Sequence, residues 1–570
     1  MSAHDFPSQA RPSRGLSGRQ AGLSLWCWVM LLAVGGLVAA AVLGAVTDES
    51  GLIPETALAR LHQPPGGGGA GWAAEVEALA GYLQQQCGVA CGDRVLLQMQ
   101  NCPQFVAAFY AILRADAVVV PASPMLLAGE LRYLLDDSGA QVVFTSQELL
   151  ANWTPLHDEG KPAQMVVACH ADRAGDDVIE APDWVRTPRQ TLHNATQITW
   201  HEVIAAGLAP AAMQAGMDDL ACLPYTSGTT GQPKGCMHTH RSLMFTAVAA
   251  AQWASQVPAD VVLVSLPMFH VTGMQVSMNA AIYAGATQVI MPRWDRELAV
   301  RLIARHRVTT WSAIATMMID VLSLPLLDTA ALKSLRRVSG GGAAMPAAIA
   351  QKLRDLTGLR YIEGYGLTET IATTHSNPAH HPKQQCLGMP IFDTISMVID
   401  PDSLCVLPAG EVGEIVTHGP QLFEGYWRDD TKTCAAFIEI DGQRFLRTGD
   451  LGYVDADGYF FFTDRLKRMI NISGYKVWPA EVEAMMYRHP EIRDCCVVAA
   501  TDSRRGETVK AYVVRKEGST LDADQLMDWA RGQMATYKVP RVVAFVDSLP
   551  KSATGKVLWR VLQDAEMVAR

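Results

Sequence analysis

A glycine- and hydroxyl-rich stretch near the middle of the chain has the residue types that bind phosphate. It reads YTSGTTGQPKG from Tyr225 to Gly235 and supplies seven candidate ligand contacts: Thr226, Ser227, Gly228, Thr229, Thr230, Gly231 and Lys234. The glycines let the backbone turn and approach closely, so amides and hydroxyls can surround phosphate oxygens while the lysine adds positive charge. A Ser or Thr follows the lysine of a Walker A motif, whereas glycine follows Lys234, which argues against a P-loop kinase. The stretch predicts a phosphate-binding loop rather than an ordinary flexible polar loop.

Other polar residues suit the remaining parts of a nucleotide. Tyr365 can stack on a purine, and Thr368 can donate a hydrogen bond to an α-phosphate. Glu369 offers a hard carboxylate oxygen to Mg²⁺, which binds through one or two carboxylates plus substrate phosphates. Asp450 offers two acceptor oxygens to the hydroxyls of a ribose, and Arg465 can reach the same sugar or the phosphates. The alternatives are a solvated Glu369 and a turn-capping Asp450.

Helices and short apolar strands that alternate along the chain must position these residues. Continuous apolar runs are typical of parallel strands that are buried on both faces. We therefore expect an α/β fold, with a large N-terminal domain of parallel-type sheets and helices followed by a small α+β domain. Predicted helices cover 75–86 and 104–113, and predicted strands cover 95–97, 118–120, 142–144, 261–264, 287–291, 496–499, 510–514 and 542–546.

Six motifs, in order, resemble those of the adenylate-forming superfamily, which includes acyl-CoA synthetases, luciferases and the adenylation domains of peptide synthetases. The resemblance runs from about residue 75 to the C-terminus. It implies an AMP-binding domain over 71–464 and a small mobile C-terminal domain over 465–570, with Mg²⁺ as cofactor and ATP and CoA as substrates. Besides the loop at 225–235, the motifs are GGAA at 341–344, YGLTE at 365–369, RTGD at 447–450, DRLK at 464–467 and PKSATGK at 550–556.

The resemblance also implies roles for residues that composition alone would leave unassigned. Gly341, Gly342 and Ala343 match an adenine-contacting turn, and Gly366 belongs to the diagnostic pentapeptide. In the small domain, Lys556 matches the lysine that bridges carboxylate and α-phosphate, and Gly474 matches a loop beside the path of the thiol. Lys467 matches the hinge between domains. One surface cannot present Lys556 and also open a thiol path, so the small domain is expected to rotate between the two half-reactions.

His270 bears on which acid is activated. It stands in PMFHVTG, 267–273, where the family has an acyl-pocket motif, and it replaces the aspartate that holds the ammonium group in amino-acid activators. We therefore expect a carboxylic acid without an α-amino group, with His270 among the catalytic residues; a packed core histidine is the alternative. The stretch 313–318, AIATMM, suits either an apolar tail or an ordinary helix core. A medium- or long-chain fatty acid is the first expectation, and an aryl or other apolar acid is the second.

Two features outside the motifs concern location and partners. The net charge is −10 without a long basic run, which points to small-molecule partners rather than nucleic acid, and the twelve scattered cysteines suggest a reducing cytosol rather than a zinc site. Residues 23–46 are uncharged and apolar, about 36 Å long if helical, which is enough to span a bilayer. However, arginines precede this segment and acids follow it, and this charge order would place the enzyme away from cytosolic ATP.

The interpretations of residues 1–70 therefore stay open among a membrane anchor, an interfacial anchor at the inner face, a signal peptide, a core helix and a stretch that is no working part of the enzyme. Residues 64–69, PPGGGG, resemble a linker. We expect a cytoplasmic enzyme, membrane-associated if the segment is an anchor.

Two competing functions remain to be separated from acid–CoA ligation. The first is an acyl-AMP ligase that loads a separate carrier protein. The second is a non-enzymatic membrane protein that keeps the fold as a binding module. The presence of Lys234, Glu369, Asp450 and Lys556 argues against the second, because a chain without activity would be expected to have lost some of them.

Overall fold

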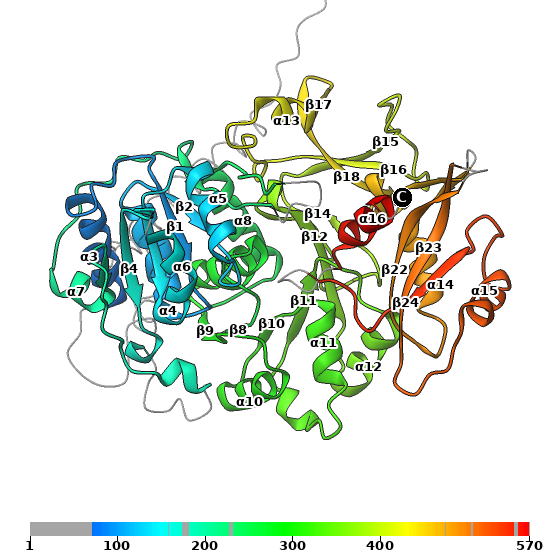
Figure 1. Ribbon diagram of the computed structural model, residues 1–570, viewed down its shortest axis with the longest axis horizontal. Coiled ribbons are helices and arrows are strands. Elements are labelled where there is room, and N and C mark those ends of the chain that lie inside the picture. Colours follow the sequence, from blue (N-terminus) through cyan, green and yellow to red (C-terminus); the bar gives the residue numbers. More distant parts are fainter. Residues whose placement is uncertain are drawn as a thin grey trace, which may run out of the picture. The chain divides into compact units, whose positions relative to one another are not determined.

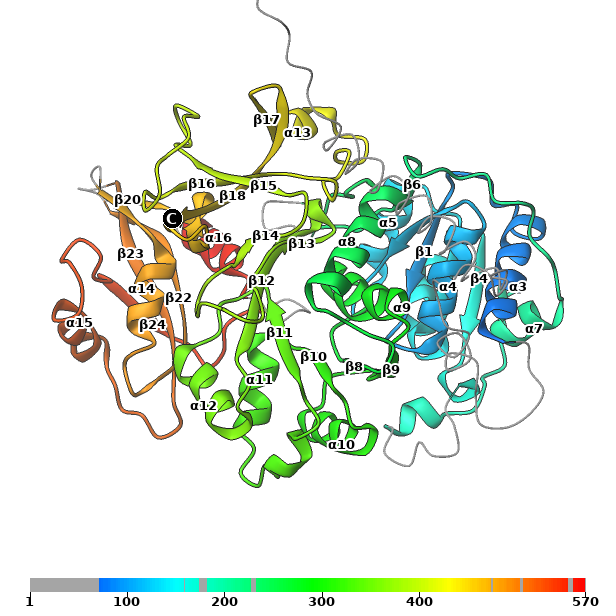
Figure 2. The same ribbon diagram turned by 180° about the vertical axis from the view of Figure 1, so that it is seen from behind.

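The structure of the protein is a computed structural model that describes residues 71–157, 159–173, 182–226, 232–472, 475–502, 506–551 and 557–568. Figures 1 and 2 show it from opposite sides. Four β-sheets and their helices make up this part of the chain. The apolar segment 23–46 and the linker at 64–69 lie outside the described residues. None of the helices in the described ranges is long and apolar enough to cross a membrane.

The first sheet has seven strands in the order β5-β4-β3-β1-β2-β6-β7. Neighbouring strands are parallel, except that β7 is antiparallel to β6. Helix α3 packs against α4, and α5 packs against α6. The strands are β1 (Arg94–Gln98), β2 (Val118–Pro121), β3 (Val142–Ser146), β4 (Gln164–Ala168), β5 (Gln197–Thr199), β6 (Leu220–Cys222) and β7 (His238–Thr239), and the helices are α3 (Trp72–Gln85), α4 (Pro103–Arg114), α5 (Ala128–Ser138), α6 (Leu150–His157) and α7 (Trp200–Ala205).

Helix α4 shows how the local sequence fixes these elements. Cys102 caps the helix, since its Sγ accepts a hydrogen bond from the N–H of Phe105 at 3.3 Å. Pro103 follows at the first helical position, where its missing N–H leaves no hydrogen bond unmade. Every residue of β2, the strand that follows the helix, is buried. The prediction of continuous apolar strands buried on both faces is confirmed here.

The second sheet also has seven strands, in the order β14-β13-β12-β11-β10-β8-β9. Its β9, β8, β10, β11 and β12 are parallel, and β13 and β14 complete it in antiparallel fashion. Figures 1 and 2 both show α11 and α12 side by side near β10 to β12. The strands are β8 (Val261–Val264), β9 (Thr287–Ile290), β10 (Thr310–Ser312), β11 (Arg337–Gly341), β12 (Tyr361–Leu367), β13 (Ala372–Ser376) and β14 (Met389–Pro390), and the helices are α8 (His240–Trp253), α9 (Ala280–Tyr283), α10 (Arg296–His306), α11 (Ala315–Leu322) and α12 (Ala347–Thr357).

The third sheet is antiparallel, and the sequence patterns did not identify it. Its order is β15-β16-β18-β17, and β19 pairs with β18. The long strand β18 carries the RTGD motif and β19 carries the start of the DRLK motif, so this sheet supplies two of the expected nucleotide residues, Asp450 and Arg465. Its members are β15 (Ile395–Ile399), β16 (Gly413–His418), α13 (Asp430–Ala435), β17 (Phe437–Ile440), β18 (Gln443–Val454) and β19 (Phe460–Arg465).

The fourth sheet belongs to the C-terminal part of the chain. Its order is β21-β20-β23-β22, with β24 added parallel to β23. A single turn of 3₁₀-helix, Leu466–Arg468, joins it to β19. The elements are β20 (Ile470–Ile472), β21 (Tyr475–Val477), α14 (Pro479–Met486), β22 (Ile492–Asp502), β23 (Gly506–Arg515), α15 (Ala523–Arg531), β24 (Val542–Phe545) and α16 (Trp559–Val568).

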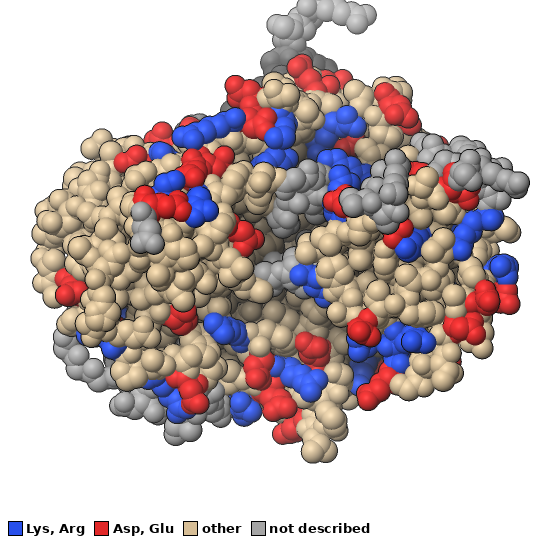
Figure 3. All heavy atoms as spheres, viewed as in Figure 1, with Lys and Arg blue, Asp and Glu red and all other residues tan. Residues whose placement is uncertain are grey.

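The α/β class, with a large part of parallel-type sheets and a smaller C-terminal part, is confirmed. One core cluster packs around Trp311 and takes in Ala313, Ala315, Met317 and Met318. Four residues of the apolar stretch 313–318 thus pack in this core, and α11 begins within the stretch at Ala315. On the face shown in Figure 3, Lys and Arg side chains lie among Asp and Glu side chains.

Candidate nucleotide and acid site

The predicted nucleotide residues of the second sheet gather at one edge of it. Strands β8, β10, β11 and β12 are parallel, so their carboxyl ends meet at the same edge. His270 follows β8, Gly341 ends β11 and Thr368 follows β12. Ligands of open α/β sheets bind outside the carboxyl ends of the strands. The edge therefore places the expected acyl motif beside the expected adenine and phosphate motifs.

Glycines let the main chain come close at this edge. A Cβ on Gly341 would lie 2.4 Å from a carbonyl oxygen of β12, and one on Gly366 would lie 1.3 Å from the carbonyl oxygen of Ala372. Both distances are too short for any side chain. Gly342 has φ +81°, and both Gly342 and Ala343 are exposed. The turn after β11 is thus open to a flat ligand such as a purine.

A buried carboxylate, which the sequence analysis missed, supports this turn from behind. Glu363 on β12 accepts hydrogen bonds from the N–H groups of Met345 and Cys386, each at 2.7 Å. Its side chain is buried, and burial raises the pKa of its carboxyl to about 7. One carboxyl group therefore ties the chain after the adenine turn to the loop before β14.

Tyr365, Asp450 and Arg465 form the centre of the site. The Tyr365 hydroxyl donates to Asp450 Oδ2 at 2.6 Å, and Arg465 Nε lies 3.0 Å from Asp450 Oδ1. Asp450 pairs with Arg465 across β18 and β19, and its side chain is 1% exposed. The Asp450 carboxylate is the first cause of a raised pKa at Arg465. Burial, and then Asp450, raise the pKa of Tyr365 well above its usual range, so its hydroxyl stays protonated and donates.

The other oxygen of Asp450, Oδ1, is buried beside Arg465. Although Oδ1 is ion-paired with Arg465, it is buried and makes no hydrogen bond with the described residues. A buried acceptor without a hydrogen bond is costly, and a ligand that donates to it recovers that cost. The paired hydroxyls of a ribose are donors of this kind. The ribose contact expected for Asp450 stays a prediction.

The Thr368–Glu369 turn is held by three hydrogen bonds from other segments. His238 Nε2 lies 2.7 Å from the carbonyl oxygen of Thr368. The N–H of Phe423 donates to the carbonyl oxygen of Glu369 at 2.9 Å, and the Tyr426 hydroxyl donates to Glu369 Oε1 at 2.8 Å. Neither His238 nor Tyr426 was identified from the sequence. Together these contacts hold the main chain of the turn and one oxygen of the Glu369 carboxylate.

A buried histidine and two residues of unusual backbone conformation adjoin this turn. His238 is fully buried, and burial lowers its pKa to about 4, so a neutral ring donates its Nε2 hydrogen to the carbonyl. Directly after the turn, Ile371 and Ala372 have φ +42° and +107°. Such conformations are rare for residues with a Cβ and concentrate at functional sites, where the surrounding contacts enforce them.

The phosphate-binding loop is closed at its base by the two ends of its motif. The N–H of Thr226 donates to the carbonyl oxygen of Lys234 at 2.9 Å, and the N–H of Lys234 donates to Thr226 Oγ1 at 3.3 Å. Lys234 Nζ lies 3.9 Å from the centre of the Tyr426 ring. The tip of the loop, which comprises Ser227, Gly228, Thr229, Thr230 and Gly231, lies outside the described residues.

The residues present fit a Mg²⁺ ion that is bound together with a nucleotide. Among the described residues, no group of three or more His, Cys, Asp or Glu side chains could hold a metal by itself. Mg²⁺ usually takes one or two carboxylates and completes its shell with phosphates and water. Glu369 supplies such a carboxylate, held by Tyr426 through Oε1 alone. The metal role predicted for Glu369 is compatible with this geometry.

The acyl motif is anchored by one buried amide. Asn101 Nδ2 donates to the carbonyl oxygens of Leu266 at 2.9 Å and Met291 at 3.2 Å, and its Oδ1 accepts from the N–H of Met268 at 2.7 Å. His270 stands two residues further on, where its Nδ1 accepts from the N–H of Thr272 at 3.3 Å. A π-helix, Gly273–Asn279, follows, and such helices are frequent at functional sites. Asn101 is a further residue that the sequence analysis missed.

The hinge motif lies close to the nucleotide cluster. Lys467 is exposed and belongs to the 3₁₀ turn Leu466–Arg468. Its pKa is lowered first by partial burial and then by the charges of Lys234, Arg560 and Arg465. Lys467 is therefore near enough to three other cations to feel their charge. The two residues expected to act in turn, Lys556 and Gly474, lie outside the described residues.

The chain is similar to known proteins over most of its length. The sequence profile described as "AMP-binding enzyme" matches residues 71–427, and that described as "AMP-binding enzyme C-terminal domain" matches residues 481–556. A long-chain-fatty-acid–CoA ligase of Bacillus subtilis is 33% identical over 508 residues, which is 86% of this chain and 88% of that protein. A feruloyl-CoA synthase of an Amycolatopsis species is 34% identical over 473 residues, 83% of this chain and 88% of that protein.

A solved structure extends the similarity to three dimensions. ATP-bound MatB from Rhodopseudomonas palustris superposes with a TM-score of 0.77 at 28% identity, over 88% of this chain and 94% of that chain. ATP-dependent acid–CoA ligation, with ATP and CoA as substrates and Mg²⁺ as cofactor, is thereby confirmed. The class of acid stays open, since one relative is a fatty-acid ligase and the other a feruloyl-CoA synthase. The chain belongs to the AMP-binding enzyme family.

Proposed function

We propose that the chain activates a medium- or long-chain fatty acid as acyl-AMP, with release of pyrophosphate, and then transfers the acyl group to CoA. The observation that supports adenylation most strongly is the Tyr365–Asp450–Arg465 cluster, with its buried Asp450 oxygen that lacks a hydrogen bond. The cluster recognises the nucleoside, and the Thr368–Glu369 turn directly follows β12, the strand that carries Tyr365.

In the first half-reaction, an oxygen of the substrate carboxylate attacks the α-phosphorus of ATP, and pyrophosphate leaves. Tyr365 and the Gly341–Ala343 turn bind the adenine, Asp450 binds the ribose, and Thr368 donates to the α-phosphate. Lys234 and the loop at 226–231 hold the outgoing phosphates. Mg²⁺ bound at Glu369 would neutralise negative charge on the phosphates. Lys556 bridges the carboxylate and the α-phosphate.

In the second half-reaction, the CoA thiol loses its proton and its sulfur attacks the acyl carbon, so that AMP leaves. We place the domain boundary at residues 464 and 465, between an AMP-binding domain that begins at 71 and a small domain that ends at 570. Rotation about Lys467 withdraws Lys556 and brings the Gly474 loop beside the path of the thiol.

The acyl motif supports an apolar acid without an amino group. His270 cannot supply the negative charge that an ammonium group requires. The neighbouring side chains Met268, Val271, Met274 and Met278 are buried and apolar. Methionine is flexible and packs readily against hydrocarbon of variable shape.

Acid-dependent exchange of labelled pyrophosphate into ATP tests this assignment across a panel of acids. Octanoate, palmitate, ferulate, benzoate and an amino acid should be compared at equal concentration. We expect the fatty acids to give the fastest exchange and the amino acid to give none. Fastest exchange with ferulate would instead favour an aryl acid, the alternative that the Amycolatopsis relative supports at 34% identity.

The acceptor is tested separately from the acid. Acyl transfer should be followed with CoA and with a free acyl carrier protein, using the best acid of the panel. We expect the thioester to form with CoA. Transfer to the carrier protein alone would assign the chain to the acyl-AMP ligases that load carrier proteins.

A further inference from the structure

Tyr426 touches both of the residues that are proposed to handle the charge on ATP. Its hydroxyl donates to Glu369 Oε1 at 2.8 Å, and its ring lies 3.9 Å from Lys234 Nζ. The side chain is buried, with 7% of its surface exposed. One tyrosine therefore lies between the phosphate lysine and the metal carboxylate, which are 135 positions apart in the sequence.

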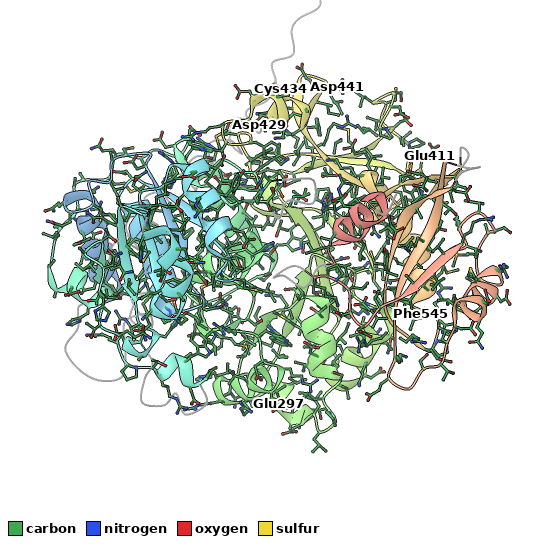
Figure 4. The ribbon with its side chains drawn as sticks, viewed as in Figure 1. Glu297, Glu411, Asp429, Cys434, Asp441 and Phe545 are labelled. Carbon is green, nitrogen blue, oxygen red and sulfur yellow. The ribbon has the colours of Figure 1, made fainter. Side chains whose placement is uncertain are left out.

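Hydrogen bonds on both sides hold the main chain around Tyr426 in place. Tyr426 forms a β-bridge with Cys236, and the N–H of Trp427 donates to the carbonyl oxygen of Gly235 at 2.8 Å. The N–H of Tyr426 donates to Thr433 Oγ1 at 2.9 Å. Thr433 lies in α13, which Figure 4 marks by Asp429 and Cys434. The segment thus binds the end of the phosphate loop on one side and α13 on the other.

The two contacts of Tyr426 have different chemistry. Its hydroxyl donates a hydrogen bond to Glu369 Oε1, whereas its ring presents a π-face to Lys234 Nζ. A donor on Oε1 fixes the rotation of the carboxylate and leaves the second oxygen of Glu369 to a metal. The ring face attracts the ammonium group of Lys234 and restricts where it points. The hydroxyl and the ring can therefore be tested apart.

We propose that Tyr426 is a positioning residue that orients the Glu369 carboxylate for Mg²⁺ through its hydroxyl and aims Lys234 at the phosphates through its ring. This proposal rests on the proposed adenylation and names a residue that neither the motifs nor the expected roles include. Tyr426 acts through Glu369 and Lys234 and has no assigned contact with substrate.

Tyr426→Phe removes the hydroxyl and keeps the ring. We expect the Mg²⁺ concentration for half-maximal pyrophosphate exchange to rise about 10-fold, because the loss of a group that orients a metal ligand typically costs 10- to 100-fold in metal affinity or activity. The KM for the acid should not change. The affinity for Mn²⁺ of the enzyme–ATP complex, measured by electron paramagnetic resonance without acid, should fall by a similar factor. Tyr426→Leu removes the ring as well and should also raise the KM for ATP.

The chain offers a matched control at Tyr459. This tyrosine is also buried, its hydroxyl donates to the carbonyl oxygen of His381 at 2.7 Å, and Lys383 Nζ lies 4.2 Å from its ring centre. Tyr459→Phe therefore removes the same atom from the same kind of setting, and we expect it to leave the Mg²⁺ requirement unchanged.

A double-mutant cycle separates positioning from a general loss of packing. In a Glu369→Gln background, Tyr426→Phe should cause no further loss of Mn²⁺ affinity, since its effect passes through the carboxylate. If Tyr426→Phe leaves the Mg²⁺ and Mn²⁺ constants like those of Tyr459→Phe, or if its effect is undiminished in the Gln background, the proposal is overturned. A wild-type enzyme without acid-dependent exchange would instead overturn the proposed function, and the Mn²⁺ measurement would still decide the role of Tyr426.

Discussion

Replacement of Asp450 by Asn tests the nucleoside site at its centre. The side chain keeps its size, but the charge that faces Arg465 and the ribose is lost. Hydrogen bonds to a charged group contribute about 1.5–3 kcal/mol each, so the loss of one should weaken ATP binding about 10- to 100-fold. The partner Arg465 is 42% exposed at its side chain, and water can therefore stabilise its unpaired charge. The main effect should fall on the sugar.

The assay compares ATP with 2′-deoxy-ATP and 3′-deoxy-ATP in pyrophosphate exchange. Wild-type enzyme should prefer ATP, because each deoxy analogue lacks one donor to Asp450. In the Asn variant this preference should shrink toward unity, since the analogue and the mutation remove the same interaction. The comparison uses ratios within one enzyme, so a general loss of activity cancels.

Asp260→Asn is the matched control. Asp260 is also buried and pairs with an arginine, since Arg336 Nη2 lies 2.6 Å from its Oδ1, but it stands at the start of β8. We expect this variant to be less stable and to keep the wild-type preference for the ribose. If Asp450→Asn also keeps the full preference, Asp450 does not bind the sugar hydroxyls and the reasoning from its buried oxygen is wrong.

Three further predictions concern the metal, the two half-reactions and pH. Glu369→Gln should weaken the use of Mg²⁺–ATP without unfolding the protein, because several kcal/mol of charge stabilisation are lost; unchanged adenylation at limiting Mg²⁺ would remove Glu369 from the metal site. Lys556→Ala should slow acyl-adenylate formation on the order of 10²–10³-fold and still convert a supplied acyl-adenylate to thioester. Gly474→Leu should keep acyl-adenylate formation and slow thioester formation. Equal loss of both steps in both variants, with ATP binding intact, would refute the rotation of the small domain between the two half-reactions. The pKa of Glu363 is raised to about 7, so the contribution of its protonated carboxyl to stability is complete below about pH 4.5 and is lost as pH rises through 7. Thermal unfolding of the wild type, followed as a function of pH, should show this loss of about 3 kcal/mol, and thermal unfolding of Glu363→Gln should not. Stabilities of wild type and variant that change in parallel with pH would contradict the prediction.

Much of the local structure could be predicted because the sequence carries it locally. The helix expected over 104–113 is Pro103–Arg114, and the strand expected over 261–264 is Val261–Val264. Both have an unbroken apolar pattern with clear ends. The ordered motifs likewise indicated Tyr365, Asp450 and Arg465, and the structure brings these three together. Their roles in binding remain predictions.

What the sequence did not reveal depends on contacts between distant segments. Asn101 anchors a loop 167 positions further on, and Tyr426 reaches a carboxylate 57 positions before it. No local pattern distinguishes such residues from ordinary polar or aromatic ones. Glu363 and His238 were missed for a related reason. Burial makes one carboxyl hard to ionise and keeps one imidazole neutral, and burial follows from the packing of whole sheets.

The most direct test of the account is a single time course with the best acid of the panel, ATP, Mg²⁺ and CoA. The account predicts that one pyrophosphate and one AMP are released for each acyl-CoA formed, and that acyl-AMP accumulates on the enzyme when CoA is left out. Release of ADP and phosphate, or thioester formation without a bound acyl-AMP, would contradict it.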